Sequence, residues 1–71
     1  MQVKAEKVIT WVNDNLPPLS WRIIAMKEMK LMLKYKISPA KIDGATYFNE
    51  EIMQSLRAHI KEAYAKELPS F

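Results

Sequence analysis

The chain has 71 residues, of which 49% are hydrophobic, and its 11 basic and 8 acidic residues give a formal net charge of +3. This length allows one small domain over residues 1–71, and the apolar content is well above that of disordered chains. The absence of cysteine and the single histidine exclude disulfides and thiolate or multi-histidine metal sites, so we expect no metal and no cofactor. No apolar run suits a secretory signal or a membrane span, so we expect a cytosolic protein without a membrane partner.

The first half of the chain predicts two helices. The first helix is expected over residues 3–15, because apolar residues recur there at helical spacing in a stripe that runs on to Leu16: Ala5, Ile9, Val12 and Leu16. A proline pair follows and ends that helix. The second helix is expected over residues 20–37, because Ser20 is a suitable N-cap, the segment is rich in helix formers, and Pro39 stops it.

The second half predicts a β-hairpin and a last helix. Asp43 and Gly44 suit the two central positions of a type I′ turn, which requires positive φ twice, so we expect a hairpin within residues 40–48. Its apolar face is expected to lie on the helices: Ala40, Ile42, Ala45 and Tyr47. The last helix is expected over residues 50–67, capped by Asn49, with a frayed end after it.

The order helix, helix, hairpin, helix defines a mainly α fold with one hairpin, arranged like a winged helix. We expect the following residues in its core: Val8, Trp11, Val12, Ile24, Leu33, Ile42, Leu56 and Ile60. On the second helix, Met26, Met29, Leu33 and Ile37 form an apolar face. Because Met32 lies half a turn away from that face, part of the apolar surface is expected to be exposed, which would indicate self-association or a protein partner.

Positive charge is concentrated in residues 22–41, which hold six basic residues and one acidic residue, whereas residues 42–71 carry a net charge of −2. Lys27, Lys30 and Lys34 follow i, i+3, i+7 spacing and therefore project from one helix face. Such clustering is typical of a surface that binds nucleic-acid phosphates. The same lysine ridge also fits the solvated side of an ordinary surface helix, and the sequence leaves both interpretations open.

The stretch from Leu33 to Ile52 resembles the helix–wing–helix passage of small phage excisionases and related MerR-type winged-helix domains. The shared features are a helix that ends in a basic and an apolar residue before proline, a Lys-Ile-x-Gly wing, an aromatic strand, and a helix that opens with a cap and acidic residues. The resemblance implies that residues 20–37 form a DNA-reading helix. Together with the basic segment it implies a DNA interface of Arg22, Lys27, Lys30, Lys34, Lys36, Lys41 and Thr46, with Asp43 and Gly44 in the wing turn.

The sequence therefore predicts a small architectural or regulatory protein on duplex DNA, such as an accessory factor of phage recombination. Because lysine acts as a point charge while arginine binds guanine through two bonds, contacts to the DNA backbone should outweigh base readout. The alternative is a helical protein–protein interaction module, such as a phage or bacterial inhibitor, whose basic face docks on an acidic protein surface. An enzyme is not expected, since no cysteine nucleophile or glycine-rich phosphate loop is present and nothing in the sequence positions a serine beside His59.

Overall fold

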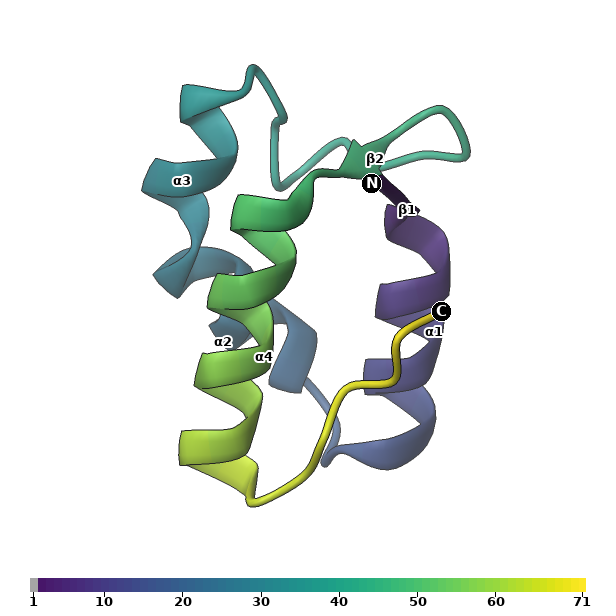
Figure 1. Ribbon diagram of the computed structural model, residues 1–71, viewed down its shortest axis with the longest axis vertical. Helices are drawn as coiled ribbons and strands as arrows, with labels where there is room; N and C mark the ends of the chain where they lie inside the picture. The colour runs from purple at the N-terminus through teal and green to yellow at the C-terminus, as the bar shows by residue number, and fades with distance from the viewer. Residues whose placement is uncertain (1) are drawn as a thin grey trace.

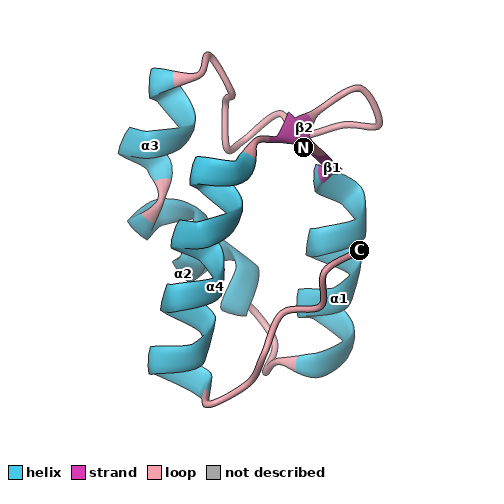
Figure 2. Ribbon diagram, in the orientation of Figure 1, coloured by secondary structure: helices cyan, strands magenta, loops and turns pink. Residues whose placement is uncertain are grey.

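The computed structural model describes residues 2–71, and its fold is mainly helical with one antiparallel strand pair (Figures 1 and 2). The elements in chain order are β1 (Val3–Lys4), α1 (Ala5–Asn15), α2 (Ser20–Lys27), α3 (Met29–Lys34), β2 (Tyr47–Phe48) and α4 (Glu50–Tyr64). In Figure 1, α4 and α1 stand on opposite sides of the view, with the strand pair above them and α2 behind α4. This arrangement confirms the predicted fold class and is compatible with a winged-helix-like order.

The strand pair is formed by different residues from those predicted. β1 and β2 pair antiparallel, with Val3 opposite Phe48 and Lys4 opposite Tyr47. The expected hairpin within residues 40–48 is therefore wrong, because its first strand comes from the start of the chain. Val3 and Phe48 are both buried, so this pairing places one apolar side chain of each strand in the core.

The turn at Asp43 and Gly44 also differs from the prediction. The Thr46 N–H donates to the Asp43 carbonyl at 3.1 Å, so Gly44 and Ala45 are the central residues of the turn. Neither Asp43 nor Gly44 has a positive φ, and the predicted type I′ turn is wrong. Side chains stabilise the observed turn instead: the Asp43 carboxylate accepts from the Ala45 N–H at 2.9 Å, and the Thr46 hydroxyl accepts from the Asp43 N–H at 3.2 Å.

The helix predicted over residues 20–37 is divided at Glu28, which has φ −96° and ψ 7°. Helical hydrogen bonds continue on both sides of it, from Glu28 N–H to Ile24 O at 2.9 Å and from Met32 N–H to Glu28 O at 3.0 Å. The Glu28 side chain is buried and accepts from the Ser55 hydroxyl on α4, with oxygen–oxygen distances of 2.5 and 2.9 Å. The two short helices therefore follow one another closely and are tied to α4 at the break.

Both ends of the α2–α3 segment contain a residue with left-handed backbone. At the start, Leu19 is the N-cap residue with φ 69°, and Ser20, the predicted N-cap, is the buried first residue of α2. At the end, Lys36 has φ 61° and the Ile37 N–H donates to the Met32 carbonyl at 2.9 Å. This is the C-terminal hydrogen-bond pattern that closes a helix before it reaches a following proline, and it ends α3 earlier than predicted.

The last helix follows the prediction more closely. The Asn49 side chain accepts from the Ile52 N–H at 2.9 Å, which confirms it as the N-cap of α4. The helix ends at Tyr64, before the predicted residue 67, because Ala65 adopts a left-handed conformation with φ 55°. The segment beyond it returns to α1 in Figure 1, and Leu68, expected in a frayed end, is buried.

One apolar core joins all four helices and both strands. Five of the predicted core residues are fully buried: Val8, Val12, Ile24, Leu56 and Ile60. Trp11 and Ile42 are half-buried against this core, whereas Leu33 is 54% exposed and that prediction is wrong.

The expected inner face of the hairpin is mostly outside the core. Ala40 and Ala45 are exposed, as is Tyr47, while Phe48 is fully buried and stacks on the Trp21 ring at a centroid distance of 6.1 Å. Successive residues of a strand point to opposite faces, so a register that buries Phe48 exposes Tyr47.

Candidate nucleic-acid interface

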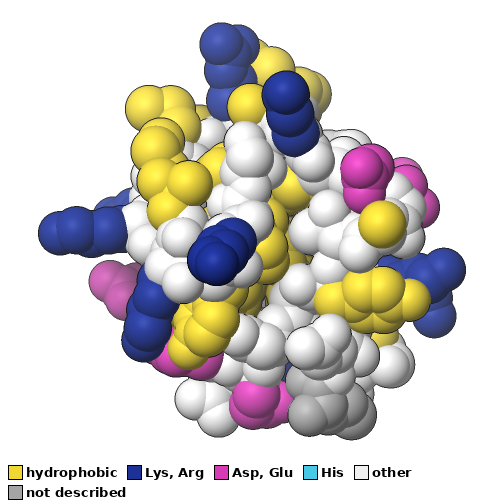
Figure 3. Space-filling view, turned by 90° about the horizontal axis from the view of Figure 1, so that it is seen from above, with side chains coloured by type: hydrophobic (Ala, Val, Ile, Leu, Met, Phe, Trp, Pro, Cys, Tyr) yellow, Lys and Arg dark blue, Asp and Glu magenta, His cyan; other side chains and the backbone are white. Residues whose placement is uncertain are grey.

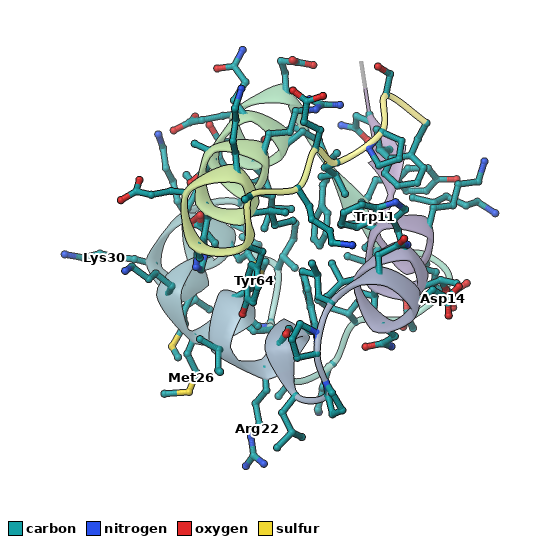
Figure 4. The ribbon with its side chains drawn as sticks, turned by 90° about the horizontal axis from the view of Figure 1, so that it is seen from below. Trp11, Asp14, Arg22, Met26, Lys30 and Tyr64 are labelled. Atoms are coloured by element: carbon teal, nitrogen blue, oxygen red, sulfur yellow. The ribbon has the colours of Figure 1, made fainter. Side chains whose placement is uncertain are left out.

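The most exposed side of α2 and α3 combines basic and apolar side chains. Arg22, Met26 and Lys30 form one row of i, i+4, i+8 spacing and point away from the core, but in Figure 4 they fan out, with Arg22 and Lys30 in clearly different directions. The core lies on the opposite side, where Ile24 and Met32 are fully buried. We define the outer face of α2 and α3 by its exposed residues, which are Leu19, Arg22, Ile23, Met26, Met29, Lys30 and Leu33.

The apolar face predicted on this segment is largely exposed, whereas Met32, half a turn away, is the buried residue. Met26 and Met29 are 66% and 42% exposed, and Leu33 is exposed as well. The sequence did contain a signal for the true buried side, since Ile24 and Met32 are eight residues apart on one helix face. Glu28 lies midway between them. Because a charged residue is not expected in a core, the buried stripe of Ile24, Glu28 and Met32 could not be recognised from the sequence.

Lys34, at the edge of the outer face, is already matched by an acidic residue. Its Nζ lies 3.4 Å from the Glu51 carboxylate on α4, and the Tyr35 hydroxyl donates to the same carboxylate. The hydrogen bond and the charge of Glu51 raise the pKa of Lys34. The Tyr35 hydroxyl and then the Lys34 ammonium lower the pKa of Glu51. Of the three lysines of the ridge, Lys34 is thus the one least available to bind a phosphate.

Lys27 lies on the same flank, toward α4. It lines a hollow of about 490 Å³ together with Glu28, Ser55, His59 and Glu62. Lys30 remains on the outward row with Arg22 (Figure 4). The structure therefore divides the predicted lysine ridge into one outward residue and two residues beside acidic groups of α4.

The segment between α3 and β2 lies against the other flank of the outer face. Pro39 and Ala40 line a shallow hollow of about 330 Å³ with Arg22, Met26 and Met29. The predicted wing segment therefore lies beside α2.

The predicted wing residues differ in their availability. Lys36 and Lys41 are exposed. Thr46 is half-buried and its hydroxyl belongs to the Asp43 turn, so a phosphate contact through that hydroxyl is not expected. Gly44 faces Glu6, because a Cβ at Gly44 would lie 3.4 Å from a carboxylate oxygen of Glu6.

Positive charge on this side is largely unmatched by ion pairs. Within residues 2–71, the ion pairs closer than 4 Å are Lys34–Glu51 and Lys61–Glu67. The cations of the basic segment outside those pairs are Arg22, Lys27, Lys30, Lys36 and Lys41. Figure 3 shows Lys and Arg side chains around the half of the molecule that holds α3, with hydrophobic side chains between them.

The hollow between α2 and α4 brings together groups that the sequence did not place near each other. Ser55 and His59 line it with Glu28. The Ser55 hydroxyl bonds the Glu28 carboxylate, and the buried Nδ1 of His59 has no hydrogen-bond partner within the described chain. A nucleophilic serine requires a hydrogen bond to the base, and here that hydroxyl is directed to a carboxylate.

Other site types find no support in the described part of the chain. Residues 2–71 contain no cluster of three or more metal-binding side chains. None of their helices has the length and hydrophobicity needed to cross a membrane. Comparison with family models, curated proteins and solved structures finds no match, so geometry and charge carry the functional argument.

Proposed function

We propose that this chain is a small cytosolic DNA-binding protein of architectural or regulatory type, which contacts duplex DNA through the outer face of α2 and α3 and the adjoining segment 36–46. The observation that carries the proposal is the outward row of Arg22 and Lys30 beside a segment that adds Lys36 and Lys41. An exposed basic helix face with a basic loop at its side is the arrangement with which helix-and-wing proteins follow phosphates.

The fold supports this use of α2. Helix α1 packs on α2, and Ile24 and Met32 fix the inner side of α2 and α3 in the core. The outer face is thus held by rigid elements, which a groove contact requires. Arg22 is the only arginine of the interface and is the residue expected to contact a base edge, whereas the lysines contact phosphates.

The salt dependence of binding tests the proposal. Fluorescence anisotropy with a random-sequence duplex should show binding at low ionic strength. The affinity should fall with salt at a log–log slope of about −4 to −5, as expected for about five phosphate contacts. Lys30→Gln should flatten the slope by about one. Lys34→Gln should flatten it less, because Glu51 already neutralises that charge.

Lys61→Gln is the matched control, since it removes a lysine of α4 that is paired with Glu67 at 3.6 Å. Its slope should equal that of the unmodified protein. The proposal fails if the folded protein does not bind duplex at low salt, or if Lys61→Gln and Lys30→Gln change the slope equally.

A further inference from the structure

The outer face carries more apolar surface than contacts to DNA phosphates would use. Within residues 2–71, eight large hydrophobic residues are exposed, and five of them lie between residues 19 and 33. They are Leu19 (69% exposed), Ile23 (56%), Met26 (66%), Met29 (42%) and Leu33 (54%). Several exposed apolar side chains on one side of a small domain are typical of a surface that contacts another protein.

The spacing of this surface matches a helix–helix seam. Leu19, Ile23, Met26 and Leu33 fall at intervals of four, three and seven residues, and Lys30 divides the last interval into four and three. Alternating steps of four and three are the a and d positions of a heptad repeat, in which a single lysine at an a position specifies register and oligomer state. The seam is interrupted at Glu28, where α2 ends and α3 begins, and Leu19 precedes α2 with left-handed backbone. The hydrogen bonds from Glu28 N–H to Ile24 O and from Met32 N–H to Glu28 O hold the two helices in direct succession, so Ile23 and Met26 of α2 are followed by Leu33 of α3.

Charges beside the seam determine which helix fits it. Arg22 lies on one side of the seam, and Lys27 and Lys34 lie on the other, at the g and e positions of the same heptads. Because Lys34 is already paired with Glu51, the cations that a partner helix would meet without an ion pair are Arg22, Lys27 and Lys30. A second copy of this chain would place these cations against each other and would leave Lys30 in the seam facing like charge. Acidic residues at the e and g positions of a different helix would match them.

We propose that the outer face docks an acidic amphipathic helix of a partner protein, and that this helix competes with duplex DNA for the same surface. The docking rests on the outer face alone, whereas the competition also rests on the proposed DNA binding. The hollow lined by Trp21, Met26, Met29 and Pro39 accepts an apolar anchor of the partner helix beside the seam.

The probe is a designed helical peptide of about three heptads, with leucine at a and d and glutamate at e and g. Its control has lysine at e and g. At low salt the full chain should bind the glutamate peptide at least about tenfold more tightly than the lysine peptide. Equal affinity for both peptides, or no binding of the glutamate peptide at about 1 mM, overturns the proposal.

Variants locate the contact. Ile23→Gln with Met26→Gln should weaken peptide binding at least about tenfold. The fold should be retained, because both side chains are more than half exposed. Phe71→Gln removes an exposed apolar side chain elsewhere and should leave the affinity unchanged. An unaffected double variant overturns the proposed surface, and so does sedimentation that shows a stable dimer of the unmodified chain.

A competition measurement separates this proposal from the proposed function. The glutamate peptide should release a labelled duplex over the concentration range in which it binds the chain. A ternary complex of chain, peptide and duplex overturns the competition. If the chain binds the peptide but no duplex, the proposed DNA function fails and the docking of an acidic helix stands.

Discussion

The two sides of α2 and α3 use the same kinds of residue with opposite outcomes. Ile24 is fully buried while its neighbour Ile23 is 56% exposed, and Met32 is fully buried while Met26 is 66% exposed. On one side these side chains fix the helices to the core. On the other side they stay mostly open to solvent, with Pro39 and Ala40 beside Met26 at one flank. The contrast teaches that only the inner side of this segment uses its hydrophobicity for folding, which leaves the outer side for the binding that we propose.

The largest expected effect is a difference in the free energy of unfolding between two matched variants, one on each side of the segment. Ile24→Ala should lower the free energy of unfolding by about 2–5 kcal/mol, because it leaves a cavity in a fully buried site. Ile23→Ala, one residue away, should stay within about 1 kcal/mol of the unmodified protein. Chemical denaturation measures both. Equal losses would show that Ile23 is covered in the folded protein and would remove the exposed outer face.

The next effect concerns how α4 holds the break between α2 and α3. Ser55→Ala removes the hydroxyl that bonds the buried Glu28 carboxylate and should cost about 1–3 kcal/mol. Ser38→Ala, at an exposed position, is the control and should cost much less. If thermal melting shows the same midpoint for both variants, the contact between Ser55 and Glu28 does not stabilise the inner side.

Leu19 gives an effect of the opposite sign. Its left-handed backbone is unfavourable for a residue with a side chain, and its side chain is 69% exposed, so Leu19→Gly should stabilise the protein by about 1 kcal/mol. Leu33→Gly is the matched control inside α3, where glycine should destabilise by about 0.5–1 kcal/mol. A loss of stability in both variants would mean that the Leu19 side chain stabilises the fold by packing, despite its high exposure.

The smallest effect is the pH dependence of the ion pair at the edge of the outer face. Folding lowers the pKa of Glu51 through the Tyr35 hydroxyl and Lys34, so the carboxylate stabilises the fold above its ordinary pKa. This contribution is lost as the pH falls through the lowered pKa. The stability difference between the unmodified protein and Glu51→Gln should therefore be constant above about pH 5 and vanish in stronger acid. A difference that persists in acid contradicts the ionic contribution.

The sequence was sufficient for the helices whose signals are local. The Asn49 cap and the helical spacing of Leu56 and Ile60 indicate α4, because caps and helical spacing act within a few residues. It was not sufficient for the strand pair. Val3 and Phe48 are far apart in the chain, and no local pattern identifies a partner at that distance. The Asp43-Gly44 pair predicted a type I′ hairpin turn. In the structure these residues belong to a different turn, which is held by the side chains of Asp43 and Thr46.

The sequence predicted the position of the basic segment but not the orientation of the apolar side chains beside it. The charge of residues 22–41 follows from composition, and Arg22 and Lys30 do project outward. Two features depend on tertiary contacts that the sequence does not reveal. One is the pairing of Lys34 with Glu51 on α4, and the other is the burial of Glu28, which turns Met26 and Met29 outward.

The most direct test of the central claim is the map of backbone amide shifts when a random-sequence duplex is titrated into the labelled protein at low salt. The largest shifts are predicted at residues 19–34 and in the adjoining segment 36–46. Residues of α1 and the C-terminal segment after Tyr64 should shift little. Shifts that concentrate on α1 or on that C-terminal segment, with residues 19–34 unchanged, would contradict the assignment of the outer face of α2 and α3 as the binding surface.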